Sequence, residues 1–160
     1  MGTVPNCHFG KNYHGKNDAL KLDNQLCFPL YAASREIIRR YTPYLEPLGI
    51  TYTQYVTLMV LWEKGAVSVK ELGTKLFLDS GTLTPVLKSL EAKGLVSRKR
   101  SAQDERVLIA ELTPHGEALK DQCVDIPAKV AGCMELDPQE AAALYTILYK
   151  LLGQCPKGAK

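Results

Sequence analysis

Residues 68–119 read SVKELGTKLFLDSGTLTPVLKSLEAKGLVSRKRSAQDERVLIAELTPHGEAL, and this stretch decides the fold. Its capping signals predict two short helices, one from Ser68 to about Phe77 and one that Asp79 caps and Gly94 ends. Two short strands, VSRKR and RVLIAEL, follow on either side of the polar SAQDE. Two short helices followed by a β-hairpin are the arrangement of a winged helix-turn-helix.

Apolar residues at helical spacing continue before this stretch and predict a helix over residues 22–45. Asp23 or Asn24 can cap its start. The prolines of TPYLEP (residues 42–47) are expected to end it, because proline disfavours helix in the residue before it. Pro29 lies too deep for the first helical position and is expected to bend or delay the first turns.

The other predicted helices also carry start and stop signals. They are a helix from Thr51, which forms a capping box with Gln54, to Gly65; a long helix from Thr113, with a kink at Pro127; and a last helix from Asp137 to Gly153. Three of the predicted helices, the first (residues 22–45), the fifth (from Thr113) and the sixth (residues 137–153), carry apolar stripes. These stripes have no partner within the small helix-turn-helix lobe. We therefore expect them to be buried against a second copy of the chain.

These patterns predict a mainly α fold with a small β-hairpin, namely a winged helix-turn-helix with a helical dimerisation region. The expected parts are a flexible extension over residues 1–21, a winged helix domain over 22–155 with a DNA-binding lobe at about 51–112 and dimerisation helices at about 22–48 and 114–153, and a tail over 156–160.

Composition excludes several classes of protein. The chain has 160 residues, 46% of them apolar and 23% charged, which argues against a wholly disordered chain. There is neither an uncharged apolar run long enough to span a bilayer nor an apolar secretory signal, so we expect a cytoplasmic protein.

The chain has five cysteines, which are Cys7, Cys27, Cys123, Cys133 and Cys155. They form no C-x-x-C pair, and only three histidines accompany them, so we expect no structural metal and no cofactor. Cys7, His8 and His14 could bind a metal only by chance in a flexible tail. The odd number argues against a closed set of intrachain disulfides and permits reactive thiols or pairing between chains.

Charge alone says little, because the net charge is only +3. Residues 88–100, however, carry five basic groups and only one acidic group, Glu91. Such a patch is a candidate phosphate-contacting surface, although an ordinary solvated face is the alternative.

In a helix-turn-helix, the N-terminal residues of the second helix meet the bases in the major groove. Short polar side chains and a glycine at this helix start suit contacts with bases and phosphates. The candidate DNA-contacting residues are Ser80, Gly81, Thr82, Thr84, Pro85 and Lys88. Simple helix capping is the alternative role for Ser80 and Thr82.

The hairpin supplies the second candidate surface. Arg98 and Arg100 alternate onto one face of the first strand, and Arg106 follows the turn. An arginine at this place can enter the minor groove. Asp104 could fix the turn or orient an arginine. A charged turn without function is the alternative, but its position directly after the candidate reading helix favours a DNA-contacting role.

These residues closely resemble the MarR family of transcription factors, whose D-x-R wing is present as Asp104-Glu105-Arg106. The strings LDNQLCFPLYAASREI and GITYTQYVTLMVLWE resemble the organic hydroperoxide resistance regulator (OhrR) subfamily. The resemblance runs from about Leu22 to about Leu152. It implies a homodimeric repressor that binds an inverted-repeat operator and releases it when a cysteine is oxidised.

Cys27 is the candidate sensor. It falls in the first turns of a helix, where a thiolate is stabilised and can be oxidised by a peroxide to a sulfenic acid. A small buried apolar cysteine is the alternative, and the residues alone leave both open. The resemblance implies that Cys27 is the peroxidatic cysteine and that Tyr41 and Tyr52 donate to its sulfur across the dimer. Tyr31 is expected to line the same pocket, whereas Pro29 departs from the subfamily string.

The resemblance also implies two subtypes, one with a lone sensor and one with a resolving cysteine in the fifth helix. We expect Cys133 of the other protomer to resolve Cys27, with Cys123 as the alternative. Cys155 is expected to be incidental.

Three functions compete. The first is a peroxide-sensing repressor, and the second is a MarR-type repressor released by a small aromatic ligand, with Cys27 merely buried. The third is a thiol peroxidase, in which the reading helix and wing would have no purpose. We therefore expect a DNA-binding regulator rather than an enzyme.

Overall fold

The structure is a computed structural model that describes residues 15–153. The chain forms two compact units, one up to Val124 and one from Asp125 onward. Among residues 15–153, no helix combines the length and the apolar character needed to cross a membrane.

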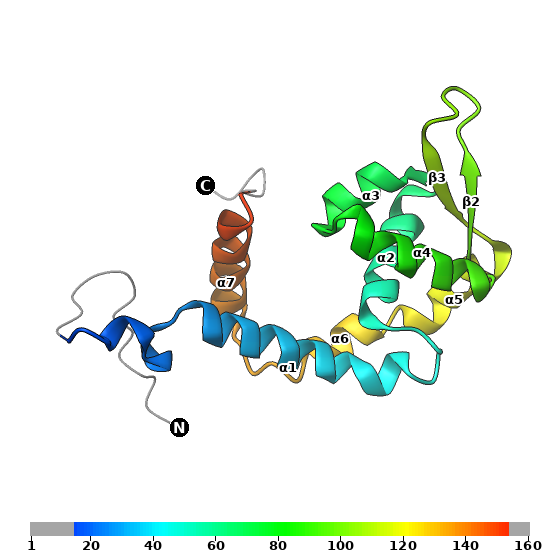
Figure 1. Cartoon of the computed structure of the whole chain (residues 1–160). Helices are drawn as coiled ribbons and strands as arrows, with labels where there is room; N and C mark the ends of the chain where they lie inside the picture. Colours follow the sequence, from blue (N-terminus) through cyan, green and yellow to red (C-terminus); the bar gives the residue numbers. More distant parts are fainter. Residues whose placement is uncertain (1–14, 154–160) are drawn as a thin grey trace. The chain divides into compact units, whose positions relative to one another are not determined.

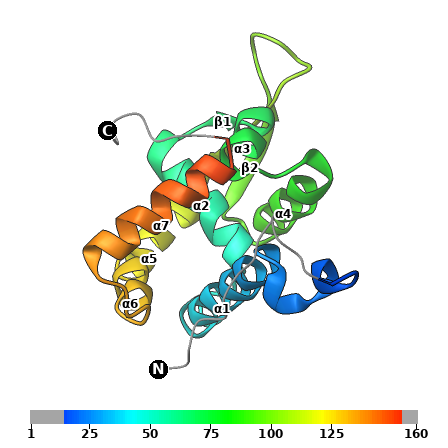
Figure 2. The ribbon, with the colours of Figure 1, turned by 90° about the vertical axis from the view of Figure 1, so that its left-hand side faces the viewer.

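The first unit is mostly helical and carries a small sheet (Figure 1). Its elements are η1 (Asp18–Leu20), η2 (Leu22–Asn24), α1 (Cys27–Leu45), α2 (Tyr52–Lys64), β1 (Val67–Ser68), α3 (Val69–Leu76), α4 (Ser80–Ala92), β2 (Val96–Arg100), β3 (Leu108–Leu112) and α5 (Pro114–Cys123). In two views, the loop of the β2–β3 hairpin lies at the end of this unit opposite α1 (Figures 1 and 2). The predicted mainly α fold with a winged helix-turn-helix is confirmed.

The sheet has three antiparallel strands in the order β1-β3-β2. In the hairpin Val96 pairs with Leu112, and Arg100 pairs with Leu108. The predicted hairpin is confirmed, but β3 begins at Leu108 rather than at residue 106. The sequence did not predict β1, whose Val67 pairs with Ala110. A strand of two residues carries no periodicity of its own.

The core of this unit lies between α2, α3, α4 and the sheet. Its fully buried side chains are mainly leucines at helical spacing, among them Leu58, Leu61, Leu72, Leu83, Leu87 and Leu90. Burial of each contributes about 1.5–3 kcal/mol relative to exposure. Gly73 lets the turn between α3 and α4 approach α3 closely, because a Cβ at Gly73 would lie only 2.7 Å from the carbonyl oxygen of Leu78. This packing fixes the position of α4 in the unit.

Helix α1 begins later than predicted. Residues 22–24 form the separate 3-10 turn η2, and α1 starts at Cys27 with Leu26 as its N-cap and no side-chain capping bond. The prediction that Asp23 or Asn24 caps this helix is wrong, because the Asn24 amide donates instead to the carbonyl oxygen of Asp18, at 2.9 Å.

The two prolines of α1 have different effects. Pro29 is the third residue of the helix, where backbone N–H groups have no intrahelical partner, so its missing N–H breaks no helical bond. The helix therefore begins at Cys27 rather than at residue 22, with Pro29 inside its first turn. Pro43 lies inside the helix, which continues to Leu45, so the prediction that Pro43 ends it is wrong. Pro47 does follow the helix end.

The second unit contains α6 (Ile126–Ala131) and α7 (Pro138–Leu151). The sequence predicted one long helix with a kink at Pro127, but the structure has two helices. Helix α5 ends at Cys123, and α6 begins at Ile126, with Pro127 in its first turn. Asp137 and Glu140 form the capping box of α7. Helix α7 has no buried residue, and Tyr145 and Ile147 are 52% and 55% exposed. An apolar helix this exposed needs a covering partner.

Candidate DNA-reading surface and thiol site

Asp79 organises the start of α4, the candidate reading helix. One of its carboxylate oxygens, Oδ1, accepts the backbone N–H of Thr82 at 2.8 Å, and Oδ2 accepts the Thr82 hydroxyl at 3.2 Å. The backbone bond from Thr82 is the main cause that lowers the pKa of Asp79, and the hydroxyl bond adds to it. A Cβ at Gly81 would lie 3.0 Å from Asp79 Oδ1, so glycine leaves room for the capping carboxylate.

Helix α4 has one buried face and one exposed face. The exposed face carries every candidate contact residue, namely Ser80, Gly81, Thr82, Thr84, Pro85 and Lys88. The Thr84 hydroxyl donates to the Ser80 carbonyl oxygen at 2.6 Å, so the hydroxyls of Thr82 and Thr84 both donate within the helix. They keep acceptor lone pairs for a ligand. In the described part of the chain, no ion pair or hydrogen bond engages the Lys88 ammonium group.

The wing turn is held by Asp104. Its Oδ1 accepts the backbone N–H of Arg106 at 2.9 Å, and its carbonyl oxygen accepts the N–H of Val107 at 2.9 Å. Asp104 therefore takes the first of its two expected roles, which is to fix the turn. Arg100 donates to the Glu105 carbonyl oxygen at 2.7 Å. The exposed Arg106 guanidinium makes no bond to any residue that the structure describes.

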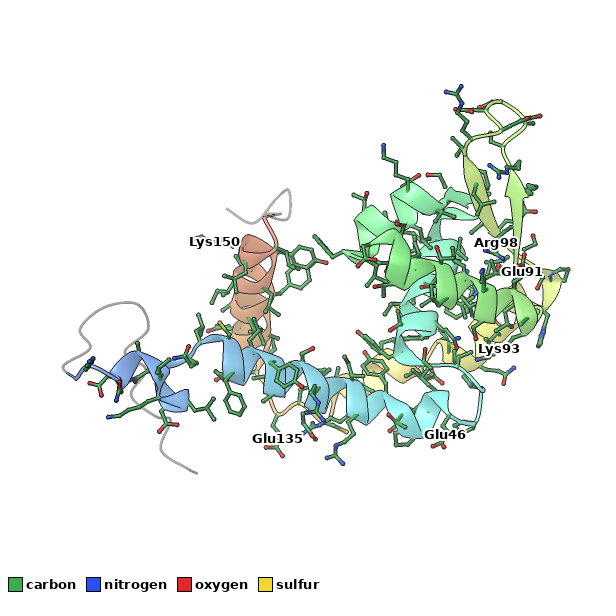
Figure 3. The ribbon with its side chains drawn as sticks, in the orientation of Figure 1. Glu46, Glu91, Lys93, Arg98, Glu135 and Lys150 are labelled. Atoms are coloured by element: carbon green, nitrogen blue, oxygen red, sulfur yellow. The ribbon has the colours of Figure 1, made fainter. Side chains whose placement is uncertain are left out.

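Among residues 15–153, most basic side chains of the segment 88–100 bond to other residues of the lobe, whereas Lys88 does not. Arg98 bonds to Glu91 (Figure 3), and its side chain is only 19% exposed. Lys93 bonds to Gln54 at 2.9 Å, and Lys99 pairs with Glu111 at 2.7 Å. Of the residues expected to contact DNA, Lys88 and Arg106 thus keep cationic groups free for phosphate, whereas Arg98 is engaged inside the lobe. Sequence reasoning missed Glu91 and Gln54 as partners, because their bonds depend on how the elements pack.

Cys27 occupies the first position of α1 and is exposed. No side chain caps this helix start. A helix N-terminus without a side-chain cap presents backbone N–H groups and a partial positive charge to an anion. An exposed thiol at this place is accessible to an oxidant, so the alternative of a buried apolar Cys27 does not hold in the single chain.

The tyrosines form a cluster at the other end of α1. The ring centroids of Tyr41 and Tyr52 are 4.9 Å apart, and Tyr55 lies 5.8 Å from Tyr41. Desolvation raises the pKa of Tyr41 and of Tyr52, and raises that of Tyr55 to about 12 with smaller contributions from its neighbours. Tyr41 and Cys27 lie on one continuous helix, about 21 Å apart along its axis. The Cys27 sulfur and this phenol are therefore not in contact within one chain.

Tyr31 lies one turn beyond Cys27 and is engaged by its own helix. Its hydroxyl accepts a hydrogen bond from Arg35 at 3.3 Å, and the Arg35 guanidinium carbon lies 5.5 Å from the ring centre. Tyr31 is 58% exposed, so the structure leaves it available at the surface near the thiol.

The two candidate resolving thiols differ in access. Cys123, the last residue of α5, is only 3% exposed, and burial raises the pKa of its thiol. Cys133 lies two residues beyond α6, is exposed, and donates to the Lys129 carbonyl oxygen at 3.3 Å. Cys133 is therefore the more accessible of the two.

Cys7, His8, His14 and Cys155 lie outside the described residues. Within residues 15–153, no group of three or more His, Cys, Asp or Glu side chains is placed to hold a metal ion.

Comparison with known proteins identifies the class. The family described as transcriptional regulator SarA/Rot matches residues 39–123. The organic hydroperoxide resistance transcriptional regulator of Bacillus subtilis (strain 168) is 49% identical over 137 residues, which are 86% of this chain and 93% of that protein. A mutant MarR from E. coli in complex with operator DNA is 30% identical, with a TM-score of 0.70 over 79% of this chain and 93% of that one.

AbfR of Staphylococcus epidermidis has been solved in several redox forms. Reduced AbfR bound to DNA is 36% identical, with a TM-score of 0.71 over 86% of this chain and 96% of that one. Overoxidised AbfR bound to DNA has the same identity and TM-score, over 87% of this chain and 98% of that one. The disulfide form is 37% identical, with a TM-score of 0.61 over 86% and 96%.

The fold, the exposed face of α4 and these relatives define a winged helix-turn-helix transcription regulator that binds DNA. The chain belongs to the MarR family. The relatives named above are transcriptional regulators and not enzymes.

Proposed function

We propose that this chain is a redox-sensing repressor. Its homodimer binds an inverted-repeat operator and leaves it when an organic hydroperoxide oxidises Cys27, first to a sulfenic acid and then to a disulfide. The name of the Bacillus relative supports the peroxide signal, and the DNA-bound and disulfide forms of AbfR support the switch.

The single observation that carries the proposal is the place of Cys27. It is an exposed thiol at an uncapped helix start, and the Tyr41–Tyr52 cluster lies at the far end of the same helix. A complete sensor therefore needs two chains, in which the phenols of one protomer donate to the thiolate of the other. Such donation stabilises the thiolate without adding a charge.

The chemistry has two steps. The Cys27 thiolate attacks one peroxide oxygen, so that an S–O bond forms, the O–O bond breaks, and the alkoxide takes a proton to leave as an alcohol. The sulfur of the partner's Cys133 then attacks the Cys27 sulfur. An S–S bond forms, the S–O bond breaks, and the hydroxide leaves as water with the thiol proton. Exposure favours Cys133 over the buried Cys123 for this second step.

Assembly of two chains would cover apolar surface that one chain exposes. On α1 this surface includes Phe28, Leu30 and Ile38, and on α7 it includes Tyr145 and Ile147. Two-fold symmetry would present two copies of α4 to half-sites roughly 34–36 Å apart. We assign residues 51–112 to DNA binding and the helices within 22–48 and 114–153 to dimerisation.

A second candidate has one observation in its favour. A hollow of about 470 Å³ is lined mainly by apolar residues of α1, of the loop after it and of the start of α2, including Ile38, Leu45, Ile50 and Tyr52. A small aromatic ligand would fit such a place and could release DNA without any cysteine chemistry.

Fluorescence anisotropy on operator DNA separates the two candidates. Cumene hydroperoxide should release the wild type, and a thiol reductant should restore binding. Cys27→Ser should bind DNA like the reduced wild type and stay bound in peroxide, because serine keeps the shape but forms no sulfenic acid. If Cys27→Ser leaves DNA as the wild type does, Cys27 is not the sensor. Release by an aromatic acid in the presence of reductant would favour the second candidate.

A further inference from the structure

The side chain of Gln54 bonds to the start of α2 and to the last turn of α4. Its amide oxygen accepts the backbone N–H of Thr51 at 3.1 Å, which closes the capping box of α2. The same oxygen accepts a hydrogen bond from Lys93 Nζ at 2.9 Å, and the amide nitrogen donates to Ser89 Oγ at 2.8 Å. Gln54 is only 5% exposed, so a buried amide joins the start of α2 to the end of α4.

Lys93 extends this junction to α1. It is the C-cap residue of α4 (Figure 3). Its ammonium group also donates to the carbonyl oxygen of Gly49, in the turn that follows α1. Gly49 has φ +67°, which lets the chain turn sharply into α2. A cation at the end of α4 is favoured, because the last carbonyl groups of a helix carry partial negative charge. We name Gly49, Gln54, Ser89 and Lys93 the helix junction.

The helix junction does more than cap α2. The Thr51–Gln54 capping box is local and needs neither Ser89 nor Lys93. The bonds of Gln54 to Ser89 and of Lys93 to Gly49 instead join segments that are far apart in the sequence. They tie the reading helix to the turn that ends α1.

The other end of α1 carries Cys27. The helix is 19 residues long, which corresponds to about 28 Å, and it continues past Pro43 to Leu45 without a break. A single helix therefore connects the first turn at Cys27 to the turn that contains Gly49. We infer that the helix junction couples a displacement of this first turn to α4, and that Gln54, Ser89 and Lys93 are positioning residues for redox-controlled release of DNA. The inference rests on the proposed function.

The test separates the effect of each variant on DNA binding by the reduced protein from its effect on the release of DNA by oxidation. Lys93→Met removes the ammonium group but keeps the apolar stem, and Ser89→Ala removes the hydroxyl that accepts from Gln54. Lys93→Arg keeps a cationic donor, and Lys120→Met on α5 is the matched control for loss of one charge. For each variant we would measure the Kd for operator DNA in the reduced and in the cumene hydroperoxide-oxidised state, with non-reducing gels to follow oxidation.

Lys93→Met and Ser89→Ala should oxidise like the wild type and bind DNA within about threefold of it when reduced. Their ratio of oxidised to reduced Kd should fall about tenfold, within the usual range of allosteric coupling. Lys93→Arg and Lys120→Met should keep the wild-type ratio. Wild-type ratios in both Lys93→Met and Ser89→Ala would overturn the inference and leave the proposed function intact. A wild type that peroxide does not release would overturn the proposed function and the inference with it.

Discussion

Arg98 on the wing strand donates from both Nε and Nη2 to a single carboxylate oxygen, Glu91 Oε2, on the reading helix. The Nε bond is 3.1 Å long. The hydrogen bonds from Arg98 are the main cause that holds the pKa of Glu91 below its ordinary value. This pair joins β2 to α4, so it links the two elements that would contact DNA.

The Glu91–Arg98 pair therefore predicts a positioning role for Arg98. Arg98→Gln should weaken operator binding about fivefold and leave the salt dependence unchanged, because no phosphate contact is lost. Glu91→Gln should weaken binding to a similar extent. The measurement is the Kd for operator DNA, determined by fluorescence anisotropy at salt concentrations from about 50 to about 300 mM. In this range the release of counterions from DNA makes the affinity depend measurably on salt. If Arg98→Gln instead reduces the slope of log affinity against log salt concentration by about one, Arg98 contacts a phosphate.

Lys88 and Arg106 should behave in the opposite way. Their exposed cationic groups have no partner among the described residues, so they are available to the DNA. Lys88→Ala should weaken binding to all sequences nearly equally and reduce the salt slope by about one. Arg106→Ala should weaken binding most on sites with narrow A·T-rich flanks. Lys120→Ala serves as the control for lost charge, and unchanged affinity of Arg106→Ala would remove the wing from recognition.

Gly116 should tolerate no side chain. A Cβ at this position would lie 2.0 Å from the carbonyl oxygen of Leu95, and this oxygen belongs to a backbone that cannot give way cheaply. Gly116→Ala should lower the free energy of unfolding by about 1–3 kcal/mol, the usual cost of overpacking. The fluorescence of Trp62, whose indole N–H donates to the Gly116 carbonyl oxygen at 2.9 Å, follows the urea transition directly.

Gly132→Ala is the matched control for that substitution. Gly132 has φ −60°, and the nearest atom to a Cβ there is 3.5 Å away, so alanine fits without strain. It should be neutral or stabilise the protein by up to about 1 kcal/mol. Equal stability of the two variants would contradict the close approach of α5 to Leu95.

Tyr55 should make the protein lose stability in alkali. Burial is the main cause that raises its pKa to about 12 in the folded state, while an exposed tyrosine titrates near its ordinary value of 10.0. The stabilising contribution is complete below about pH 10 and is lost as the pH rises through 12, because the unfolded chain releases this proton first. One group changes the free energy by at most about 1.4 kcal/mol per pH unit.

The check is urea unfolding of wild type and Tyr55→Phe at pH 8 and pH 11, followed by circular dichroism. The stability of Tyr55→Phe should fall less between the two pH values, because phenylalanine does not titrate. Burial also raises the pKa of the Cys123 thiol, so some alkaline loss should remain. A loss as large as that of the wild type would exclude Tyr55 as its source.

Signals that act within a few residues were predicted well. The caps at Thr51, Asp79, Thr113 and Asp137 each bond to a backbone N–H two or three residues later in the chain, so they depend only on the local sequence. The turn at Gly65 is local in the same way, because glycine adopts its positive φ without strain. These signals were sufficient to predict the winged helix-turn-helix.

Features that depend on packing were not predictable in this way. Strand β1 exists because Val67 meets Ala110, more than forty residues later. Arg98 was expected on the DNA, but its partner Glu91 is revealed only when β2 packs on α4. The buried amide of Gln54 appears in the sequence only as a capping residue, because its bonds to Ser89 and Lys93 are long-range.

The two candidate resolving cysteines give the last prediction. Cys123→Ser should cross-link like the wild type in cumene hydroperoxide, because Cys123 is buried and the exposed Cys133 remains. Cys133→Ser should react at Cys27 but form no interchain disulfide, so non-reducing gels should show monomers and mass spectrometry should show sulfenic or higher acids. Because the proposed release of DNA ends in the disulfide, Cys133→Ser should also keep more of its operator affinity after oxidation than the wild type. A Cys133→Ser protein that still cross-links fully would transfer the resolving role to Cys123 and require α5 to open.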